Sequence, residues 1–168
     1  RPTAQIYLHL THLGEPWGFD PRVILAQVQQ RFAERGLTPV VAPELEFMLL
    51  SSERDAEGIP QLSRTTINGR SQVGGQLYST DIMHEFANVL HEMREACDAL
   101  DLLHDTLVKE LAPGQNELNQ QHLDDALQAA DNAQMLKRVI KGVAQKHGFV
   151  ATFMPKPFMN VDGNGFHS

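Results

Sequence analysis

Residues 39–50 read Pro39-Val40-Val41-Ala42-Pro43-Glu44-Leu45-Glu46-Phe47-Met48-Leu49-Leu50, and this apolar run predicts a strand. Side chains two residues apart in a strand point to the same face, so Glu44 and Glu46 are expected side by side, with Leu45 and Phe47 on the opposite face. Two carboxylates this close repel each other unless they share a cation, and a hard divalent cation such as Mg²⁺ or Mn²⁺ satisfies both. The alternative is that both glutamates lie on a solvated face.

The segments around this strand predict helices at about 21–35, 79–100 and 123–147. Asp20 followed by Pro21 is a typical helix start, with Asp as the N-cap and Pro at the first helical position. Ser79 or Thr80 is expected to cap the second helix. Gly148 suits the position just after the third helix. The apolar stripes on which these predictions rest are Ile24, Val28 and Phe32; then Ile82, Phe86, Val89, Leu90, Met93, Cys97 and Leu100; then Leu123, Leu127, Ala130, Leu136, Val139, Ile140 and Val143.

The remaining segments predict short strands. Residues 6–13 and 149–154 are expected to be extended, and 107–119 to form short extended pieces around a turn at Ala112-Pro113-Gly114. Residues 51–78 are polar and Gly-rich without a period, which is long for a loop in a compact domain and typical of functional or mobile loops. This mixture of helices and strands predicts an α+β fold.

Composition excludes several classes of protein. The chain has 168 residues, a length typical of one domain or of part of a larger one. Its net charge is −7 and it has no dense basic run, which disfavours binding to nucleic acid or to an anionic membrane surface. No stretch is long and apolar enough to span a membrane, and no signal peptide opens the chain. The single cysteine, Cys97, allows no intrachain disulfide, is expected in the core, and fits a cytoplasmic protein.

Two further motifs carry candidate metal ligands. Glu110 and Glu117 bracket the Pro-Gly turn, which can bring its two flanks together. Four carboxylates with little basic charge would suit a two-cation site, although an acidic surface hairpin is the alternative. His167 follows Gly163 and Gly165 and is either a metal ligand or an ordinary surface or core histidine.

An ordered set of motifs resembles the glutamine synthetase family from about residue 19 to the end of the chain. The motifs are Pro43-Glu44-Leu45-Glu46-Phe47, Glu110-Leu111-Ala112-Pro113-Gly114-Gln115-Asn116-Glu117, Ala130-Asp131, Ala151-Thr152-Phe153-Met154-Pro155-Lys156-Pro157 and Gly163-Asn164-Gly165-Phe166-His167. Any one of them is weak, but their order and spacing together are specific. The resemblance implies an ATP-dependent ligase that joins an amine to the γ-carboxylate of glutamate through a γ-glutamyl phosphate, with Mg²⁺ or Mn²⁺ as cofactor.

The resemblance also implies roles for individual residues. Glu46, Glu110 and Glu117 would hold the metal nearer the glutamate and the amine, whereas Glu44 and His167 would hold the metal nearer the ATP phosphates. Glu110 would also receive the amine and its leaving proton, as the catalytic residue. The substrate contacts would come from Gly163, Glu46 and Gln76, and a looser match gives Asp105 as a nucleotide contact.

Two departures from the residues usual in the family bear on the substrates. Gln76 stands where the ammonia-using bacterial enzymes commonly carry a tyrosine, and Tyr78 lies two residues further on. Together with the Pro-Glu-Leu-Glu-Phe motif, this pattern is more similar to the γ-glutamylpolyamine (putrescine) synthetase branch, so an organic amine is expected. Ammonia is the alternative substrate, and a non-catalytic scaffold or regulatory protein is the alternative from another class. Asp162 replaces a frequent asparagine, which puts a glutamate contact in doubt.

The family's fold implies a curved, mainly antiparallel sheet with helices on its outer face and the metals on its inner face. Residues 1–168 are then expected to be the N-terminal part of the catalytic domain, truncated at both ends, without the small N-terminal domain and the C-terminal half of the site. Such a fragment alone is expected to be inactive. The full-length protein is expected to form a homo-oligomeric ring with small-molecule substrates and a place in nitrogen or polyamine metabolism.

Overall fold

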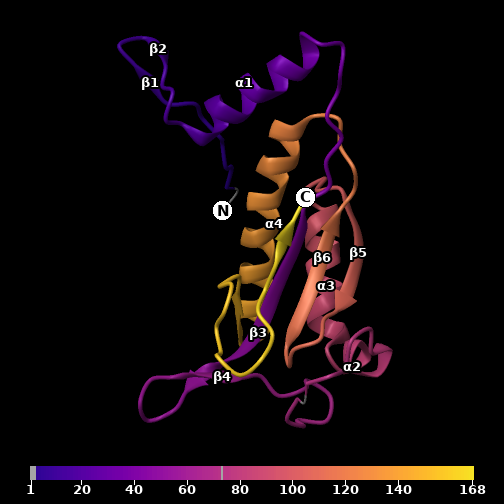
Figure 1. Cartoon of the computed structure of the whole chain (residues 1–168). Helices are drawn as coiled ribbons and strands as arrows, with labels where there is room; N and C mark the ends of the chain where they lie inside the picture. The colour runs from indigo at the N-terminus through magenta and orange to yellow at the C-terminus, as the bar shows by residue number, and fades with distance from the viewer. Residues whose placement is uncertain (1–2, 73) are drawn as a thin grey trace.

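The structure is a computed structural model that describes residues 3–72 and 74–168. Its main feature is a six-stranded sheet in which every paired strand is antiparallel. The strands of this sheet are β3 (Glu44–Arg54), β4 (Pro60–Leu62), β5 (His104–Lys109), β6 (Gln115–Gln120), β7 (Phe149–Thr152) and β8 (Phe166–His167). A separate two-stranded hairpin near the N-terminus consists of β1 (Thr11–His12) and β2 (Glu15–Pro16). The predicted α+β class and the mainly antiparallel sheet are confirmed (Figure 1).

Strand β3 is the central strand of the sheet and pairs with four other strands. Strand β6 pairs with its first half, and β4 pairs with its far end at Leu50 and Arg54. On the other edge, β8 pairs at Glu44 and Leu45, and β7 pairs from Met48 to Ser51. Segments from all parts of the chain therefore meet on one strand.

The alternation along β3 separates the two faces of the sheet. Leu45, Phe47 and Leu49 are fully buried against α3 (Ala87–Asp98) and α4 (Ala126–Lys146), which cover one face (Figure 1). Each such side chain contributes about 1.5–3 kcal/mol relative to an exposed one. Glu44 and Glu46 alternate with these residues and so point to the face away from the helices. The predicted placement of helices on one face and glutamates on the other is confirmed.

Side-chain caps explain where the helices begin. Asp20 accepts a hydrogen bond from the Arg22 backbone N–H at 2.8 Å and starts α1 (Pro21–Ala33). Ser79 accepts one from Ile82 at 3.3 Å and starts α2 (Thr80–Glu85). The third predicted helix is α4, which begins three residues later than expected, where Asp125 caps it. Gly148 follows α4 with φ +77°, a conformation that glycine adopts without strain.

Several predicted boundaries were wrong. The helix expected over 79–100 is interrupted at Phe86 (φ −110°, ψ 12°), which separates α2 from α3. The strand expected over 39–50 runs from Glu44 to Arg54 instead, and the expected strand 149–154 ends at Thr152. Of the strand expected over 6–13, only β1 is formed.

The segment 51–78 is more ordered than a plain loop. It contains the end of β3, the strand β4 and an isolated bridge between Arg64 and Ser71. Sequence periodicity missed these elements because they are short and largely exposed, so their residues alternate without an apolar signal.

Among the described residues, no helix is long and apolar enough to cross a membrane. Cys97 is fully buried, as predicted, and burial raises the pKa of its thiol to about 11.

Candidate metal centre

Three neighbouring strands bring candidate ligands to one place on the face away from the helices. Glu44 pairs with His167 across β3 and β8, and Glu46 pairs with Glu117 across β3 and β6. Residues directly opposite on adjacent antiparallel strands have Cβ atoms only about 4.5–5.5 Å apart. The register of the sheet therefore assembles residues that are up to about 120 positions apart in the sequence.

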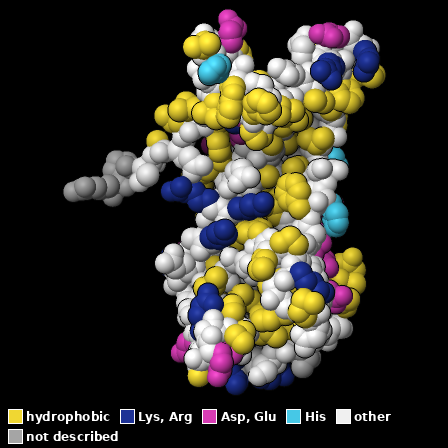
Figure 2. Space-filling view, turned by 60° about the vertical axis from the view of Figure 1, so that its left-hand side comes forward, with side chains coloured by type: hydrophobic (Ala, Val, Ile, Leu, Met, Phe, Trp, Pro, Cys, Tyr) yellow, Lys and Arg dark blue, Asp and Glu magenta, His cyan; other side chains and the backbone are white. Residues whose placement is uncertain are grey.

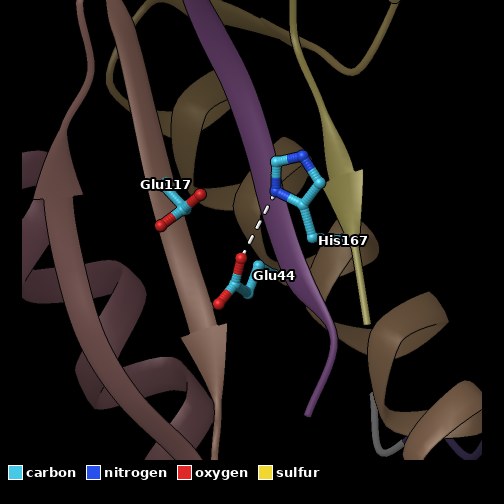
Figure 3. A group of neighbouring side chains, drawn as sticks. All are labelled: Glu44, Glu117 and His167. Carbon is cyan, nitrogen blue, oxygen red and sulfur yellow. Dashed lines mark ion pairs between the residues drawn. The ribbon is translucent and has the colours of Figure 1, made fainter.

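Glu44, Glu117 and His167 form the tightest group. One ligand atom from each lies within 4.8 Å of the other two, and the three side chains converge on the space above β3 (Figure 3). His167 Nδ1 lies 3.3 Å from Glu44 Oε2, and the two side chains are 64% and 44% exposed. Carboxylate oxygens and an imidazole nitrogen remain accessible to an ion from solution.

Glu46 is held beside this group by Gln115 and by the glycine-rich segment before β8. The Gln115 amide donates to Glu46 Oε2 at 2.5 Å and to the Gly163 carbonyl at 2.9 Å. The Glu46 backbone N–H donates to Gly165 at 3.3 Å. A Cβ on Gly165 would lie 2.8 Å from Glu46 Oε1 and 2.9 Å from the His167 ring, so a larger residue there would displace these two side chains.

Glu110 lies directly after β5, and its electrostatics connect it to the same group. Burial raises the pKa of the Glu110 carboxyl, and the charge of Glu46 raises it further. A backbone hydrogen bond and the nearby Lys109 and His167 oppose this shift. The charges of Glu46 and His167 therefore both act on the Glu110 carboxyl.

Glu117 is half-buried between the other carboxylates. Burial raises the pKa of its carboxyl, and the charges of Glu110, Glu44 and Glu46 add to this rise. Asn119 opposes it by donating to Glu117 Oε1 at 3.1 Å. We call these five side chains the carboxylate cluster: Glu44, Glu46, Glu110, Glu117 and His167.

The donor set of the carboxylate cluster fits a hard divalent cation. Four carboxylates supply the oxygen ligands that Mg²⁺ and Mn²⁺ prefer, and imidazole also binds Mn²⁺. Burial raises the pKa values of Glu110 and Glu117, and the neighbouring carboxylates add to this rise, so the charged forms conflict with their surroundings when no cation is bound. A bound cation removes that conflict, so the residues present suit a metal.

The backbone around Gln76 runs beside the carboxylate cluster. The neighbouring Gly75 N–H donates to Leu111 at 3.1 Å and the Tyr78 N–H donates to Lys109 at 2.9 Å, so this segment runs along Glu110. Within the described residues, the side-chain oxygen of Gln76 is buried without a hydrogen-bond partner.

Asp105 is not brought to the carboxylate cluster. It is exposed on β5 and lines a groove with Met83, His91 and Arg94 from the helices. The structure thus places the candidate nucleotide contact on the helix side of the sheet.

Sequence reasoning missed Gln115 and Lys109. Gln115 lies two residues before Glu117 on β6, so strand alternation could have placed both on one face. Lys109 is 1% exposed, its ammonium donates to the carbonyls of Glu110 and Ala112, and burial lowers its pKa to about 8. A buried lysine has no sequence signal, because lysine is ordinarily an exposed residue.

The sheet thus carries helices on one face and clustered carboxylates on the other. The family model described as "Glutamine synthetase, catalytic domain" matches residues 18–168. The chain therefore belongs to the glutamine synthetase family.

Individual relatives agree with this membership. The chain is 41% identical over 154 residues to the gamma-glutamylputrescine synthetase PuuA of Escherichia coli (strain K12), covering 92% of this chain and 33% of that protein. It is 33% identical to a glutamine synthetase of Pyrococcus abyssi, covering 98% of this chain and 35% of that protein. The chain thus spans about a third of the length of the curated relatives it matches.

Solved structures share the fold. A structure titled "GmaS/ADP complex-Conformation 1" superposes with a TM-score of 0.78 at 30% identity, over 94% of this chain and 34% of that chain. The cryoEM structure of Plasmodium falciparum glutamine synthetase gives a TM-score of 0.75 at 21% identity, over 92% of this chain and 34% of that chain. The second likeness concerns the fold alone.

Proposed function

We propose that this chain is part of an ATP-dependent ligase that joins an amine to the γ-carboxylate of glutamate. The observation that carries the proposal is the convergence of Glu44, Glu117 and His167 from separate segments onto one face of the sheet, with Glu46 directly opposite Glu117. Glu110 joins them as an electrostatic neighbour of Glu46 and His167. A non-catalytic scaffold would have no use for such a cluster of like charges, since their repulsion destabilises the fold.

The proposed reaction has two steps. An oxygen of the γ-carboxylate attacks the γ-phosphorus of ATP and ADP leaves, which gives γ-glutamyl phosphate. The amine nitrogen then attacks the carbonyl carbon, phosphate leaves, and the nitrogen loses a proton. Phosphorylation is needed because oxide is a very poor leaving group, whereas phosphate is a good one.

The chain's own residues bind and orient the reactants. Glu46, Glu110 and Glu117 would hold the cation nearer the glutamate, and Glu44 with His167 the cation nearer ATP. Bound Mg²⁺ or Mn²⁺ supplies positive charge that offsets the phosphate charge during transfer. Glu110 would also accept the proton that the amine nitrogen loses. Gly163 would contact glutamate, whereas Asp105 lies on the helix side of the sheet, away from the carboxylate cluster.

An organic amine such as putrescine is the proposed second substrate. The Gln76 side chain supports this proposal, because its oxygen has no hydrogen-bond partner within the described residues and can accept a hydrogen bond from an alkylammonium group. The resemblance to a relative named gamma-glutamylputrescine synthetase agrees with it. Ammonia is the second candidate, favoured by the relatives named glutamine synthetase.

We also propose that residues 1–168 are the N-terminal part of the catalytic domain of a longer protein that assembles as a homo-oligomeric ring in the cytoplasm. The share of each relative that the chain covers, about a third, supports the first part of this proposal. The remaining ligands for ATP, glutamate and the metals would then come from the rest of that protein.

Phosphate release from ATP by the full-length protein, with glutamate, Mg²⁺ and a panel of amines, tests the function. We expect release with putrescine and little with ammonium. Release with ammonium alone would make the protein a glutamine synthetase and refute the organic amine. The absence of phosphate release with every amine would refute the ligase function and favour a non-catalytic scaffold.

Two variants sharpen this test. Glu110→Gln keeps the shape of the side chain but removes the proton acceptor, so we expect release to fall at least about 100-fold. The matched control is Glu53→Gln, which changes an exposed carboxylate at the far end of β3 and should leave the rate unchanged.

A further inference from the structure

Side chains hydrogen-bond several backbone groups of the turn that joins β5 to β6. The Ala112 N–H donates to Gln115 Oε1 at 3.0 Å, and the Gly114 N–H donates to Gln72 Oε1 at 2.7 Å. Asn116 donates to the Gly114 carbonyl at 3.0 Å. Gly114 has φ +72° and approaches the Leu49 carbonyl so closely that a Cβ would lie 2.7 Å from it. The turn is therefore confined to one conformation.

The two ends of this turn carry residues of the proposed metal centre. Glu110 precedes the turn, and Gln115, which donates to Glu46 Oε2, follows it. The Glu110 N–H also donates to the Gln115 carbonyl at 3.0 Å, so the two residues face each other across the base of the hairpin. A shift in the turn would move the Glu110 carboxylate and the amide that orients Glu46.

Lys109 is the charged member of this arrangement. Its ammonium donates to the Glu110 carbonyl and, at 2.7 Å, to the Ala112 carbonyl. The residue is 1% exposed, and a buried ammonium is costly unless its donors are satisfied. A methionine or leucine of similar size could fill the same volume without that cost, so the hydrogen bonds to the turn are what the lysine adds.

We propose that Lys109 is a positioning residue of the metal centre, which fixes the 110–114 turn so that the Glu110 carboxylate and the Gln115 amide meet the other ligands. This inference rests on the proposed function, because it assumes that the carboxylate cluster binds a divalent cation. Lys109 itself touches neither the cation nor the substrates. Groups that hold metal ligands in place commonly change metal affinity by 10–100-fold when they are removed.

The test is Mn²⁺ binding to the full-length protein, measured by electron paramagnetic resonance of free and bound Mn²⁺, in wild type and Lys109→Met. We expect the variant to bind Mn²⁺ at least about tenfold more weakly and with an altered bound spectrum. Lys109→Arg, which can reach both carbonyls with a charged donor, should recover affinity to within about threefold of wild type.

A matched control separates positioning from general stability. Met93→Ala leaves a cavity in the core under α3, which is a different cluster from the one that holds Ala112. We expect it to lower the melting temperature at least as much as Lys109→Met and to leave Mn²⁺ affinity unchanged. Should Lys109→Met not fold, Lys109→Gln replaces it, because the shorter amide cannot reach both carbonyls.

The outcomes are distinct. Wild-type affinity in Lys109→Met, or in Lys109→Gln if that variant is used, would overturn the role of Lys109 and leave the proposed function standing. An equal loss of affinity in Met93→Ala would also overturn it, because the effect would then follow stability alone. A wild-type protein that binds no Mn²⁺ would overturn the metal centre and this inference with it.

Discussion

Glu117 lies directly opposite Glu46 in the sheet, with Glu44 and Glu110 as further charged neighbours. We predict that Glu117→Gln stabilises the metal-free protein, because like charges directly opposite in a sheet cost about 0.2–1 kcal/mol. The same change should abolish most of the rise in melting temperature that Mn²⁺ produces. Thermal unfolding with and without Mn²⁺ measures both effects.

The control for this variant is Glu53→Gln on the exposed end of the same strand. It removes one negative charge without touching the cluster, so both melting temperatures should stay close to those of wild type. A Glu117→Gln protein that is still stabilised by Mn²⁺ to the wild-type extent would remove Glu117 from the set of ligands.

The pH dependence of metal binding follows from the two raised pKa values. Glu110 and Glu117 hold their protons above the ordinary value of 4.5 in the folded state, so their ionisation destabilises the metal-free protein as pH rises through the folded pKa. A cation must displace those protons to bind. We predict that the Mn²⁺-induced rise in melting temperature is small near pH 4.5 and grows towards pH 7. A rise that stays constant over this range would contradict the shared-cation interpretation.

Part of the site could be predicted at the level of single residues. Strand alternation placed Glu44 and Glu46 on one face because a two-residue period needs no knowledge of distant segments. His167 and Glu117 join them through strand register, which local sequence does not specify; the family motifs supplied that information. The hydrogen bonds of Gln115 and Lys109 depend on how the chain folds back on itself, so no local pattern predicts them.

At the scale of secondary-structure elements, the first residues of helices were easier to predict than breaks within a helix. Asp20 and Ser79 cap helices through hydrogen bonds two or three residues away, which are local and readable. The break at Phe86 follows Glu85, whose carboxylate binds Asn68 and Arg70 from the preceding segment. Those contacts span 15–17 residues, so an uninterrupted apolar stripe concealed the break.

Glu85 therefore connects α2 to the segment before it. The hydrogen bond from Arg70 holds the pKa of the Glu85 carboxyl below its ordinary value of 4.5, with help from Asn68. A lowered pKa means that Glu85 stabilises the fold above pH 4.5 and loses this contribution as pH falls through the folded pKa. We predict that Glu85→Gln lowers the melting temperature by a few degrees at pH 7 and by less at pH 3.

Circular dichroism melts at the two pH values check this prediction. Glu95→Gln, which changes an exposed glutamate on α3, is the control and should behave as wild type at both. Equal losses at pH 7 and pH 3 in Glu85→Gln would show that the carboxylate charge contributes nothing.

On the scale of the whole molecule, much of the apolar stripe of α1 is exposed, although the helix contacts α4. Ile24, Val28 and Phe32 are 45%, 40% and 39% exposed, and Val23 is the buried residue of this helix. Hydrophobic side chains gather over the end of the molecule formed by α1 and the N-terminal hairpin (Figure 2). The stripe predicted the helix correctly, but the face it marks is exposed rather than packed against the sheet.

An exposed apolar face of this kind promotes association. We predict that a protein of residues 1–168 binds the dye ANS, and that Val28→Ser with Phe32→Ser reduces this fluorescence at least about twofold without lowering the melting temperature. Val23→Ser is the contrasting change, because burying a hydroxyl in place of a methyl group should lower the melting temperature. Unchanged fluorescence in the double variant would place the dye elsewhere.

The position of β3 at the centre of the sheet has a consequence for biosynthesis. Its residue Glu44 leaves the ribosome about 120 residues before His167, its partner on β8, which at about 5–20 residues per second is an interval of roughly 6–24 s. During that time β4 and β6 can pair with one edge of β3, but the edge that later pairs with β7 and β8 stays uncovered. An uncovered strand edge is a state in which aggregation begins. Codon choice between β3 and β8 should therefore influence how much protein matures, even though it changes no residue of the carboxylate cluster.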